Sequence, residues 1–311
     1  MTNDNQKISF IIPAYNCANT IIESIDSIFD GNFEDGDEII IVNDASTDRT
    51  SQIINDLQKK YPIIKAISHN INKGSAAAGR NTGIDHSKNN LIFCLDSDNV
   101  LAINTVPVLK KYMLEQNADI ASFGEIHFFK TKIGKLTHKW TYKDEKIELK
   151  DALAGYKWPG PSGNYLFTKK SWLNAGRYNE SIGGAYDSWA FGIKQLATGS
   201  KMVTMKNSFY YHRAGHESAF IRDKDKIKPS LLALSVLVNF LDLIEEEDVD
   251  YIMSKEYRYS WFDNLEKRPL KLKNSTIGVN GLRTAKFEQE KWSSCFVSKA
   301  VKKIKNILKN N

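Results

Sequence analysis

The stretch Leu91-Ile92-Phe93-Cys94-Leu95-Asp96-Ser97-Asp98 places two carboxylates directly after a short apolar run. The run predicts a buried strand, and alternate residues of a strand point to the same side. Two carboxylates on one side repel each other unless a positive charge lies close to them. A hard cation with oxygen ligands, Mg²⁺ or Mn²⁺, is the natural candidate. A solvated acidic turn explains a single copy of this pattern equally well, so the interpretation depends on the rest of the chain.

Apolar runs of this kind alternate with helical patterns in the first third of the sequence. We expect strands over 8–12, 38–42, 63–67 and 91–95, and helices over about 20–29, 47–60 and 75–84 between them. Strands that alternate with helices over short connections are typical of an α/β fold, in which helices flank a mostly parallel sheet.

Side-chain patterns also predict where helices begin. Thr20 and Glu23 fit a capping box. Ser46 or Thr47 is the expected N-cap of the following helix. Beyond Asn99 the alternation is looser, and we expect helices over 105–116, 171–175 and 185–197, strands over 120–129 and 139–149, and mainly helix from residue 225 onward.

Three polar clusters fall at or just after the predicted strand ends: 43–48, 70–81 and 96–99. In an open parallel sheet, ligands bind beyond the carboxyl ends of the strands. The fold rule and the residue chemistry therefore predict the same location for a binding site.

The predicted site lacks the usual phosphate-binding loops, because neither a G-x-G-x-x-G sequence after the first strand nor a P-loop is present. A nucleotide would need other contacts. The ring of Tyr15 can lie against a base, and Asp44 can accept a hydrogen bond from a base N–H. Lys73 and Arg80 can meet base oxygens or phosphates.

Four motifs, in order and at fitting separations, resemble family 2 glycosyltransferases. They are Phe10-Ile11-Ile12-Pro13-Ala14-Tyr15-Asn16, the segment 40–50 with Asn43-Asp44-Ala45-Ser46, the pair Asn72-Lys73-Gly74 and Ala78-Gly79-Arg80-Asn81-Thr82-Gly83, and Asp96-Ser97-Asp98. The resemblance extends to about Arg222. It implies a GT-A (Rossmann-like) fold and an inverting transfer from a UDP-sugar.

The resemblance also implies roles for single residues. Pro13 and Tyr15 would line the uracil pocket, and Asp44 would bond the uracil N–H. Arg80 would lie by the base or the diphosphate. Asp96 would contact ribose or metal-bound water, and Asp98 would ligate Mn²⁺ or Mg²⁺ that bridges the diphosphate. The metal assignment is chemically sensible, since a cation stabilises the charge that develops on a leaving diphosphate.

Asp187 is the candidate general base. The family has a Glu-Asp pair here, and this chain has Tyr186-Asp187, which keeps the carboxylate expected to deprotonate the acceptor hydroxyl. Asp187 is also expected to be the N-cap of the helix toward Ala197, and the two roles are compatible.

The resemblance also implies that a histidine in this region can complete the metal site or touch the diphosphate, and imidazole suits Mn²⁺. His216-Glu217-Ser218 resembles the family pattern, which favours His216 marginally over His212. An exposed loop histidine accounts for either residue equally well.

Other strings bear on the acceptor and on the alternatives. The Gln-x-x-Arg-Trp string of processive family members is absent, which favours transfer of one sugar to a glycan or lipid-linked acceptor, as in the family's usual work on bacterial surface polysaccharides. The loop 158–164 is expected on the acceptor side. Two other functions stay open: a sugar-nucleotide-binding protein without catalysis, in which Tyr186 marks a decayed site, and a nucleotidyltransferase, which would usually need a Gly-rich loop near the first strand.

The net charge of +6 is a property of the tail, because residues 267–311 hold twelve Lys and Arg against two Glu. Residues 290–311 have the pattern of a basic amphipathic helix. Such a helix can lie on an anionic bilayer or pack on the domain with its lysines in solvent. Its aromatic residues share the apolar face, which argues against a nucleic-acid partner.

The remaining composition predicts a cytoplasmic protein, with possible peripheral contact at the inner face of the plasma membrane. The start of the sequence is polar, the longest apolar stretch (231–243) is too short to span a bilayer, and the three cysteines show no disulfide or metal spacing. That stretch is expected in the core or in a homo-oligomer contact. We expect a catalytic domain over 1–222, with a nucleotide half to about 100 and an acceptor half from 101, and a helical region over 223–311.

Overall fold

The strand–helix alternation of the sequence is realised in one mixed sheet. The computed structural model describes residues 6–142, 145–149, 163–181, 187–215, 245–252 and 254, all within the first of two units, Met1–Ser275 and Thr276–Asn311. The first third of the chain forms β1 (Ile8–Ala14), α1 (Ile21–Phe29), β2 (Glu38–Asn43), α2 (Thr50–Lys60), β3 (Ile64–Ser68), α3 (Ala76–Asp85) and β4 (Leu91–Cys94).

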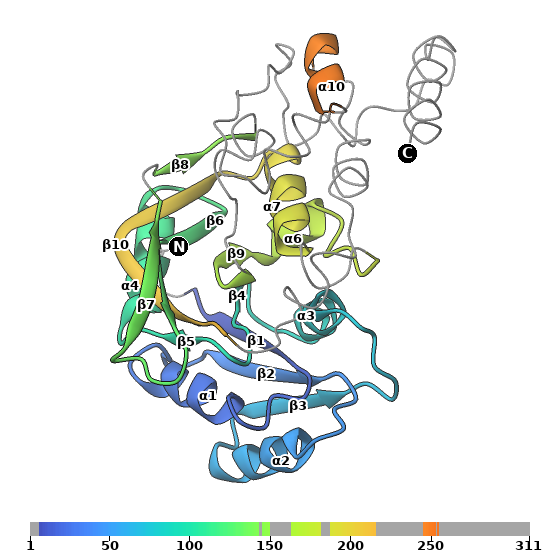
Figure 1. Cartoon of the computed structure of the whole chain (residues 1–311), viewed down its shortest axis with the longest axis vertical. Helices are drawn as coiled ribbons and strands as arrows, with labels where there is room; N and C mark the ends of the chain where they lie inside the picture. The colour runs from blue at the N-terminus through green and yellow to red at the C-terminus, as the bar shows by residue number, and fades with distance from the viewer. Residues whose placement is uncertain are drawn as a thin grey trace. The chain divides into compact units, whose positions relative to one another are not determined.

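Later segments widen this sheet and add helices. They are β5 (Val100–Leu101), α4 (Thr105–Glu115), β6 (Ile120–Phe129), β7 (Leu136–Thr141), β8 (Lys146–Ile147), β9 (Leu166–Thr168), α6 (Lys169–Asn174), α7 (Asp187–Ala197), β10 (Met202–Arg213) and α10 (Glu246–Ile252). Among the described residues the strand order is β3-β2-β1-β4-β9-β6-β10-β5, with β7 beside β6 and β8 beside β10 (Figure 1).

The strands that carry the predicted motifs are parallel. β1 pairs in parallel with β2 and with β4, and β2 pairs in parallel with β3. β6 and β10 are also parallel to each other, whereas β5, β7, β8 and β9 join in antiparallel orientation. The predicted α/β class, a mostly parallel sheet flanked by helices, is confirmed.

Helices cover both faces of the sheet. Alternate residues of β1 and β2 point into one apolar cluster together with side chains of α1, α2 and α4, among them Phe10, Ile12, Ile41, Ile25, Ile54 and Leu109. The intervening residues of β1 and β2 face α3. Alternation along a buried parallel strand therefore supplies two cores, one on each side.

Two glycines bring α3 unusually close to the sheet. A Cβ atom on Gly83 would lie 2.5 Å from Cγ2 of Ile11, and one on Gly79 would lie 3.0 Å from Cβ of Pro13. Any side chain at these two positions would push the helix outward. The close approach sets Arg80, between them, at the carboxyl end of β1.

The predicted capping box at the start of α1 is wrong. Thr20 is the N-cap residue, but its side chain makes no capping bond, and its Oγ1 donates to the carbonyl oxygen of Cys17 at 3.3 Å. Glu23 does not turn back to the helix start, because its carboxylate pairs with Arg213. Glu23 therefore makes a long-range ion pair in place of the expected local hydrogen bond.

The predicted cap of α2 is also wrong. α2 begins at Thr50, and neither Ser46 nor Thr47 caps it. Ser46 donates to Oδ1 of Asn43 at 2.6 Å. Asp48 supports the first turn instead, since its Oδ1 accepts from the backbone N–H of Thr50 at 2.9 Å.

The strand predicted over 139–149 is two strands, β7 and β8, which pair with different neighbours. The predicted domain boundary at 222/223, the segment 231–243 and the basic tail 290–311 lie outside the described residues and stay predictions. Within the part that is described, no helix is long and apolar enough to cross a bilayer.

Candidate active site

The carboxyl ends of β1, β2 and β4 meet at one edge of the sheet, because all three strands are parallel neighbours. Asp44 follows β2 directly, and Asp96 follows β4 after Leu95. The structure therefore brings the predicted polar clusters together at the predicted edge.

Asp96 is held from several sides. Its Oδ1 accepts a hydrogen bond from Nη2 of Arg80 at 2.6 Å, and its Oδ2 accepts from Nδ2 of Asn164 at 2.9 Å and of Asn99 at 3.3 Å. The backbone N–H of Asp96 donates to Oδ1 of Asn164 at 2.8 Å. Burial raises the pKa of Asp96 above its usual range, Arg80 opposes this shift, and Asp98 adds to it.

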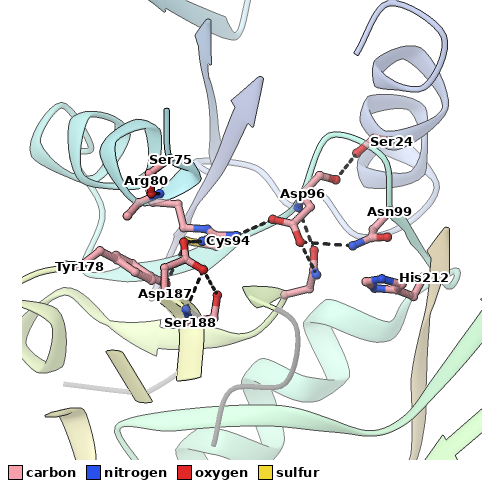
Figure 2. A network of polar contacts seen from close by, with 12 residues as sticks. Ser24, Ser75, Arg80, Cys94, Asp96, Asn99, Tyr178, Asp187, Ser188 and His212 are labelled. Carbon is pink, nitrogen blue, oxygen red and sulfur yellow. Dashed lines mark hydrogen bonds and ion pairs between the residues drawn. The ribbon is translucent and has the colours of Figure 1, made fainter. Parts of the chain in front are cut away.

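Arg80 joins Asp96 to Asp187 (Figure 2). Its Nη1 lies 2.5 Å from Oδ2 of Asp187, and its guanidinium lies over the ring of Tyr178, with Cζ 5.4 Å from the centroid. Burial opposes the charge of Arg80, but Asp187 and Asp96 outweigh burial and hold the pKa of Arg80 well above its usual range. Its buried Nε has no hydrogen-bond partner among the described residues.

Asp187 is the first residue of α7 and is buried. Its Oδ1 accepts from the backbone N–H of Ser188 at 2.8 Å and from the Ser188 hydroxyl at 3.3 Å. Both of its carboxylate oxygens are therefore engaged, one by its own helix start and one by Arg80. The predicted base lies next to the predicted metal motif, joined to it by one guanidinium.

Gly163 makes room for this arrangement. Its φ of +81° lies in the left-handed region, and a Cβ there would lie 2.6 Å from Nη2 of Arg80 and 2.8 Å from Oγ of Ser188. Only glycine satisfies both the backbone conformation and the space. The next residue, Asn164, can then reach Asp96.

A second polar chain surrounds Asp44. Its carboxylate accepts two 3.0 Å hydrogen bonds from the backbone N–H of Lys73, and its Oδ1 lies 2.6 Å from Nδ1 of His69. The other ring nitrogen of His69 lies 2.9 Å from Oγ1 of Thr82. Lys73 thus contacts Asp44 through its backbone. His69 belongs to the polar stretch at the end of β3, but its type gave no reason to single it out.

Pro13 and Tyr15 lie at the same edge. Pro13 lies against α3, since a Cβ atom on Gly79 would be 3.0 Å from the Cβ of Pro13. The side chain of Tyr15 is 43% exposed. An exposed aromatic ring at the end of β1 is available to a flat ligand.

The D-x-D loop is anchored by Arg213, which the sequence did not indicate as a site residue. Its Nε donates to the carbonyl oxygen of Asp98 at 3.1 Å, and its backbone N–H donates to Oδ1 of Asn99 at 3.0 Å. Its guanidinium also pairs with Glu23 and stacks on Phe129, with Cζ 4.5 Å from the ring centroid. A β10 arginine therefore ties the loop to α1 and β6.

The two candidate histidines have different outcomes. His212 is a half-buried residue of β10 rather than an exposed loop histidine, and Figure 2 places its ring beside Asn99. His216 lies outside the described residues. Within the described ranges, no three His, Cys, Asp or Glu side chains form a group that could hold a metal ion.

Comparison with known proteins identifies the fold and the family. The model of "Glycosyl transferase family 2" matches residues 9–176. In structure, the chain is similar to TarS 1-349 of S. aureus, with a TM-score of 0.63 and 19% identity over 83% of this chain and 73% of that chain.

Sequence relatives agree. Glycosyltransferase GlyG of Streptococcus pneumoniae is 25% identical over 81% of this chain and 90% of that protein. The GalNAc(5)-diNAcBac-PP-undecaprenol beta-1,3-glucosyltransferase of Campylobacter jejuni is 28% identical over 81% of this chain and 78% of that protein. Chondroitin synthase of Pasteurella multocida is 26% identical over 98% of this chain, which spans only 31% of the synthase. The chain has the GT-A fold and belongs to glycosyltransferase family 2.

Proposed function

We propose that the chain is a non-processive, inverting glycosyltransferase that moves one sugar from a UDP-sugar to a hydroxyl of a glycan or lipid-linked acceptor. The observation that carries this proposal is the position of Arg80 between Asp96 and Asp187. It sets a buried carboxylate, suited to proton transfer, beside the carboxylates suited to a diphosphate and its cation.

The donor assignment is supported by Asp44, Tyr15 and the comparisons. Structures of TarS exist in complex with UDP and with UDP-GlcNAc. In this chain, Tyr15 offers an exposed ring for a base, and Asp44 offers carboxylate oxygens for an N–H of that base. His69 and the N–H of Lys73 fix the orientation of Asp44. A pyrimidine base that donates an N–H, such as uracil, fits this set.

The residues present fit a divalent cation that arrives with the donor. Mg²⁺ usually takes one or two protein carboxylates and fills its other positions with phosphates and water, so a full protein cage is not needed. Asp98 is half-buried at the edge, and Asp96 is next to it. Asp98 would be the direct ligand, and Asp96, whose two oxygens accept hydrogen bonds, would contact ribose or metal-bound water. When bound, the cation supplies charge neutralisation on the leaving diphosphate.

The chain's own residues then need to supply only proton transfer and the orientation of the base. Asp187 accepts the proton of the acceptor hydroxyl as the hydroxyl oxygen attacks the anomeric carbon. The bond from that carbon to the diphosphate breaks, UDP leaves, and a single displacement inverts the configuration. Arg80 orients Asp187 through its Nη1.

The acceptor class is supported by the names of relatives. One is a poly(ribitol-phosphate) beta-glucosyltransferase, 35% identical over 37% of this chain and 18% of that protein, and another acts on a diphosphate-linked undecaprenol glycan. Both acceptors carry phosphate. We extend to this chain an acceptor of the same kind, a hydroxyl on an anionic glycan or on a lipid-linked one.

The test uses the full chain with a panel of UDP- and GDP-sugars in Mn²⁺. UDP release and the anomeric configuration of the product are followed by NMR. We expect Asp98→Asn to weaken UDP binding in Mn²⁺. Asp187→Asn should keep UDP binding but slow transfer by about a hundredfold or more, the usual effect of losing a general base. Asp85→Asn is the control, because Asp85 pairs with Arg177 at an exposed position.

Each other outcome points to another function. UDP binding without turnover, combined with no effect of Asp187→Asn on any acceptor, would indicate a sugar-nucleotide-binding protein. Release of pyrophosphate from a nucleoside triphosphate would indicate a nucleotidyltransferase. Retention of the anomeric configuration would contradict the single displacement.

A further inference from the structure

Four aromatic side chains cross β10, β6 and β7 in a row. His212 is in register with Phe128, and Phe128 is in register with His138. The rings of Phe128 and His138 stack, with centroids 4.2 Å apart and an interplanar angle of 6°. His212 and Trp140 lie on either side, 5.0 Å and 4.8 Å from the Phe128 ring. We call His212, Phe128, His138 and Trp140 the aromatic row.

One end of the aromatic row lies at the candidate active site. The ring of His212 lies beside Asn99 (Figure 2), and its Nδ1 is 3.4 Å from the hydroxyl of Tyr210. The next residue along β10, Arg213, is bonded to Asn99 and Asp98. The row therefore starts where the donor and the acceptor hydroxyl would meet.

The other end is open to solvent. Trp140 is 54% exposed, and His138, on the same side of β7, is also exposed. Phe128, in the middle of the row, is buried and belongs to the apolar cluster that also holds Leu109 and Met113 of α4. The row therefore runs from the core to an exposed end, and an exposed tryptophan beside stacked rings is a feature of ligand-contacting surfaces.

The hairpin that carries the row is basic. The sequence from Ile126 to Tyr142 holds four lysines and no Asp or Glu. Lys139 pairs with Glu125 on the side opposite the row. Lys130 extends toward the end of β10, where its carbons lie about 3.2 Å from a Cβ built on Gly215. The charge around the row is complementary to an anionic ligand.

We propose that the exposed end of the aromatic row binds the acceptor, an anionic glycan whose pyranose rings stack on Trp140 and His138. This inference rests on the proposed function. The C–H faces of a sugar ring are apolar and pack on flat aromatic faces, while imidazole nitrogens exchange hydrogen bonds with hydroxyls. The lysines of the hairpin attract the phosphate or carboxylate groups of the same chain. Extension of the row toward Asp96 leads the end of the glycan to the transfer site.

The experiment compares Trp140→Ala with Val108→Ala. Val108 is also apolar and 54% exposed, but it belongs to α4 and lies outside the aromatic row. The probe is an array of immobilised oligosaccharides, some neutral and some bearing phosphate or uronate. We expect the wild-type chain to bind anionic members, with binding reduced at high salt. Trp140→Ala should weaken it about tenfold, as for a central aromatic contact, while Trp140→Phe recovers part and Val108→Ala has no effect.

Several outcomes would overturn the inference. They are no binding of wild-type chain to any oligosaccharide, equal binding by Trp140→Ala, equal binding of neutral and anionic members, or a change in oligomeric state in Trp140→Ala, which would make a second copy the occupant. UDP affinity is measured on the same samples and should be equal in wild type and Trp140→Ala. If the wild-type chain does not bind UDP, the proposed function is contradicted. If wild type and Trp140→Ala bind the glycan equally while UDP binding is intact, only the proposed acceptor surface is contradicted.

Discussion

Nη1 of Arg80 lies 2.5 Å from Oδ2 of Asp187, although 107 residues separate the two along the chain. The same guanidinium reaches Asp96 through its second amino group. One buried arginine thus neutralises part of the charge of two carboxylates, one that follows β4 and one that begins α7. This relationship has consequences for stability as well as for catalysis.

Removal of the Arg80 charge should be strongly destabilising. Arg80→Met leaves Asp96 and Asp187 without their shared cation, and breaking a buried pair costs about 3–5 kcal/mol. Urea denaturation at pH 7 measures the free energy of unfolding. Arg177→Met is the matched control, since Arg177 also pairs with an aspartate and stacks on a ring, but both partners of its ion pair are nearly half exposed. The control should lose less than about 1 kcal/mol, and an equal loss in both variants would contradict the role of burial.

The close packing of α3 predicts a cost for a single methyl group. Gly83→Ala gains about 1 kcal/mol of helix propensity, but its Cβ would meet Ile11 at 2.5 Å. We expect a net destabilisation of about 1–3 kcal/mol, the usual cost of overpacking, measured by thermal and urea unfolding. Gly134→Ala serves as the reference because nothing lies within 4 Å of its Cβ, and it should change stability by less than about 0.5 kcal/mol. A neutral Gly83→Ala would show that α3 can move outward freely.

Glu125 predicts a dependence of stability on pH. Hydrogen bonds from His127 and Lys139 hold the pKa of Glu125 below its usual range. The folded state therefore favours the carboxylate more than the unfolded chain does, and this contribution is present above the unfolded-state pKa and is lost as the pH falls through the folded-state pKa. Glu125→Gln should be less stable than wild type at pH 7, and the difference should shrink below the ordinary glutamate pKa of about 4.3. A difference that stays constant from pH 7 to pH 3 would show that charge is not its cause.

The contacts of Arg213 predict that its replacement weakens UDP binding while the fold is kept. Arg213→Met removes the bond to the Asp98 carbonyl and the ion pair with Glu23, so the loop with the two carboxylates is less well held. We expect the dissociation constant of UDP in Mn²⁺ to rise by about tenfold, the loss of one charge-assisted hydrogen bond. Calorimetry of UDP with and without Mn²⁺ separates cation-linked binding from base binding. Arg177→Met should leave both values unchanged, and an equal loss in the absence of Mn²⁺ would point to the base pocket instead.

The sequence predicted the nucleotide half of the fold well because its signals are local. β2 and β4 are built on the apolar runs 39–42 and 91–95, and each is followed by a polar cluster, so strand identity and the edge of the site follow from period and composition. The helix predicted from Ser75 is α3. Ser75 is its N-cap, and its Oγ accepts a hydrogen bond from the N–H of Ala77 at 3.1 Å.

The contacts that the sequence did not predict join residues that are far apart along the chain. Glu23 looks like half of a capping box, and its actual partner Arg213 is 190 residues away. Asn164 and His69 are ordinary polar residues until the fold sets one against Asp96 and the other against Asp44. Sequence spacing carries no signal for such pairs. The aromatic row was hidden for the same reason, because its register spans three strands.

The long-range contacts of Arg80 also constrain the order in which the parts of this enzyme can fold. β1 to β4 are complete by Cys94, yet the guanidinium that they position stays half satisfied until α7 has been made and docked. During synthesis, the amino-terminal third therefore waits for a segment about ninety residues later, and late long-range contacts of this kind slow folding. A polypeptide cut between β5 and α7 would keep Arg80 with Asp96 in one fragment and leave Asp187 without its cation in the other. Reassembly of two such fragments would restore the Arg80–Asp187 contact together with the apolar packing.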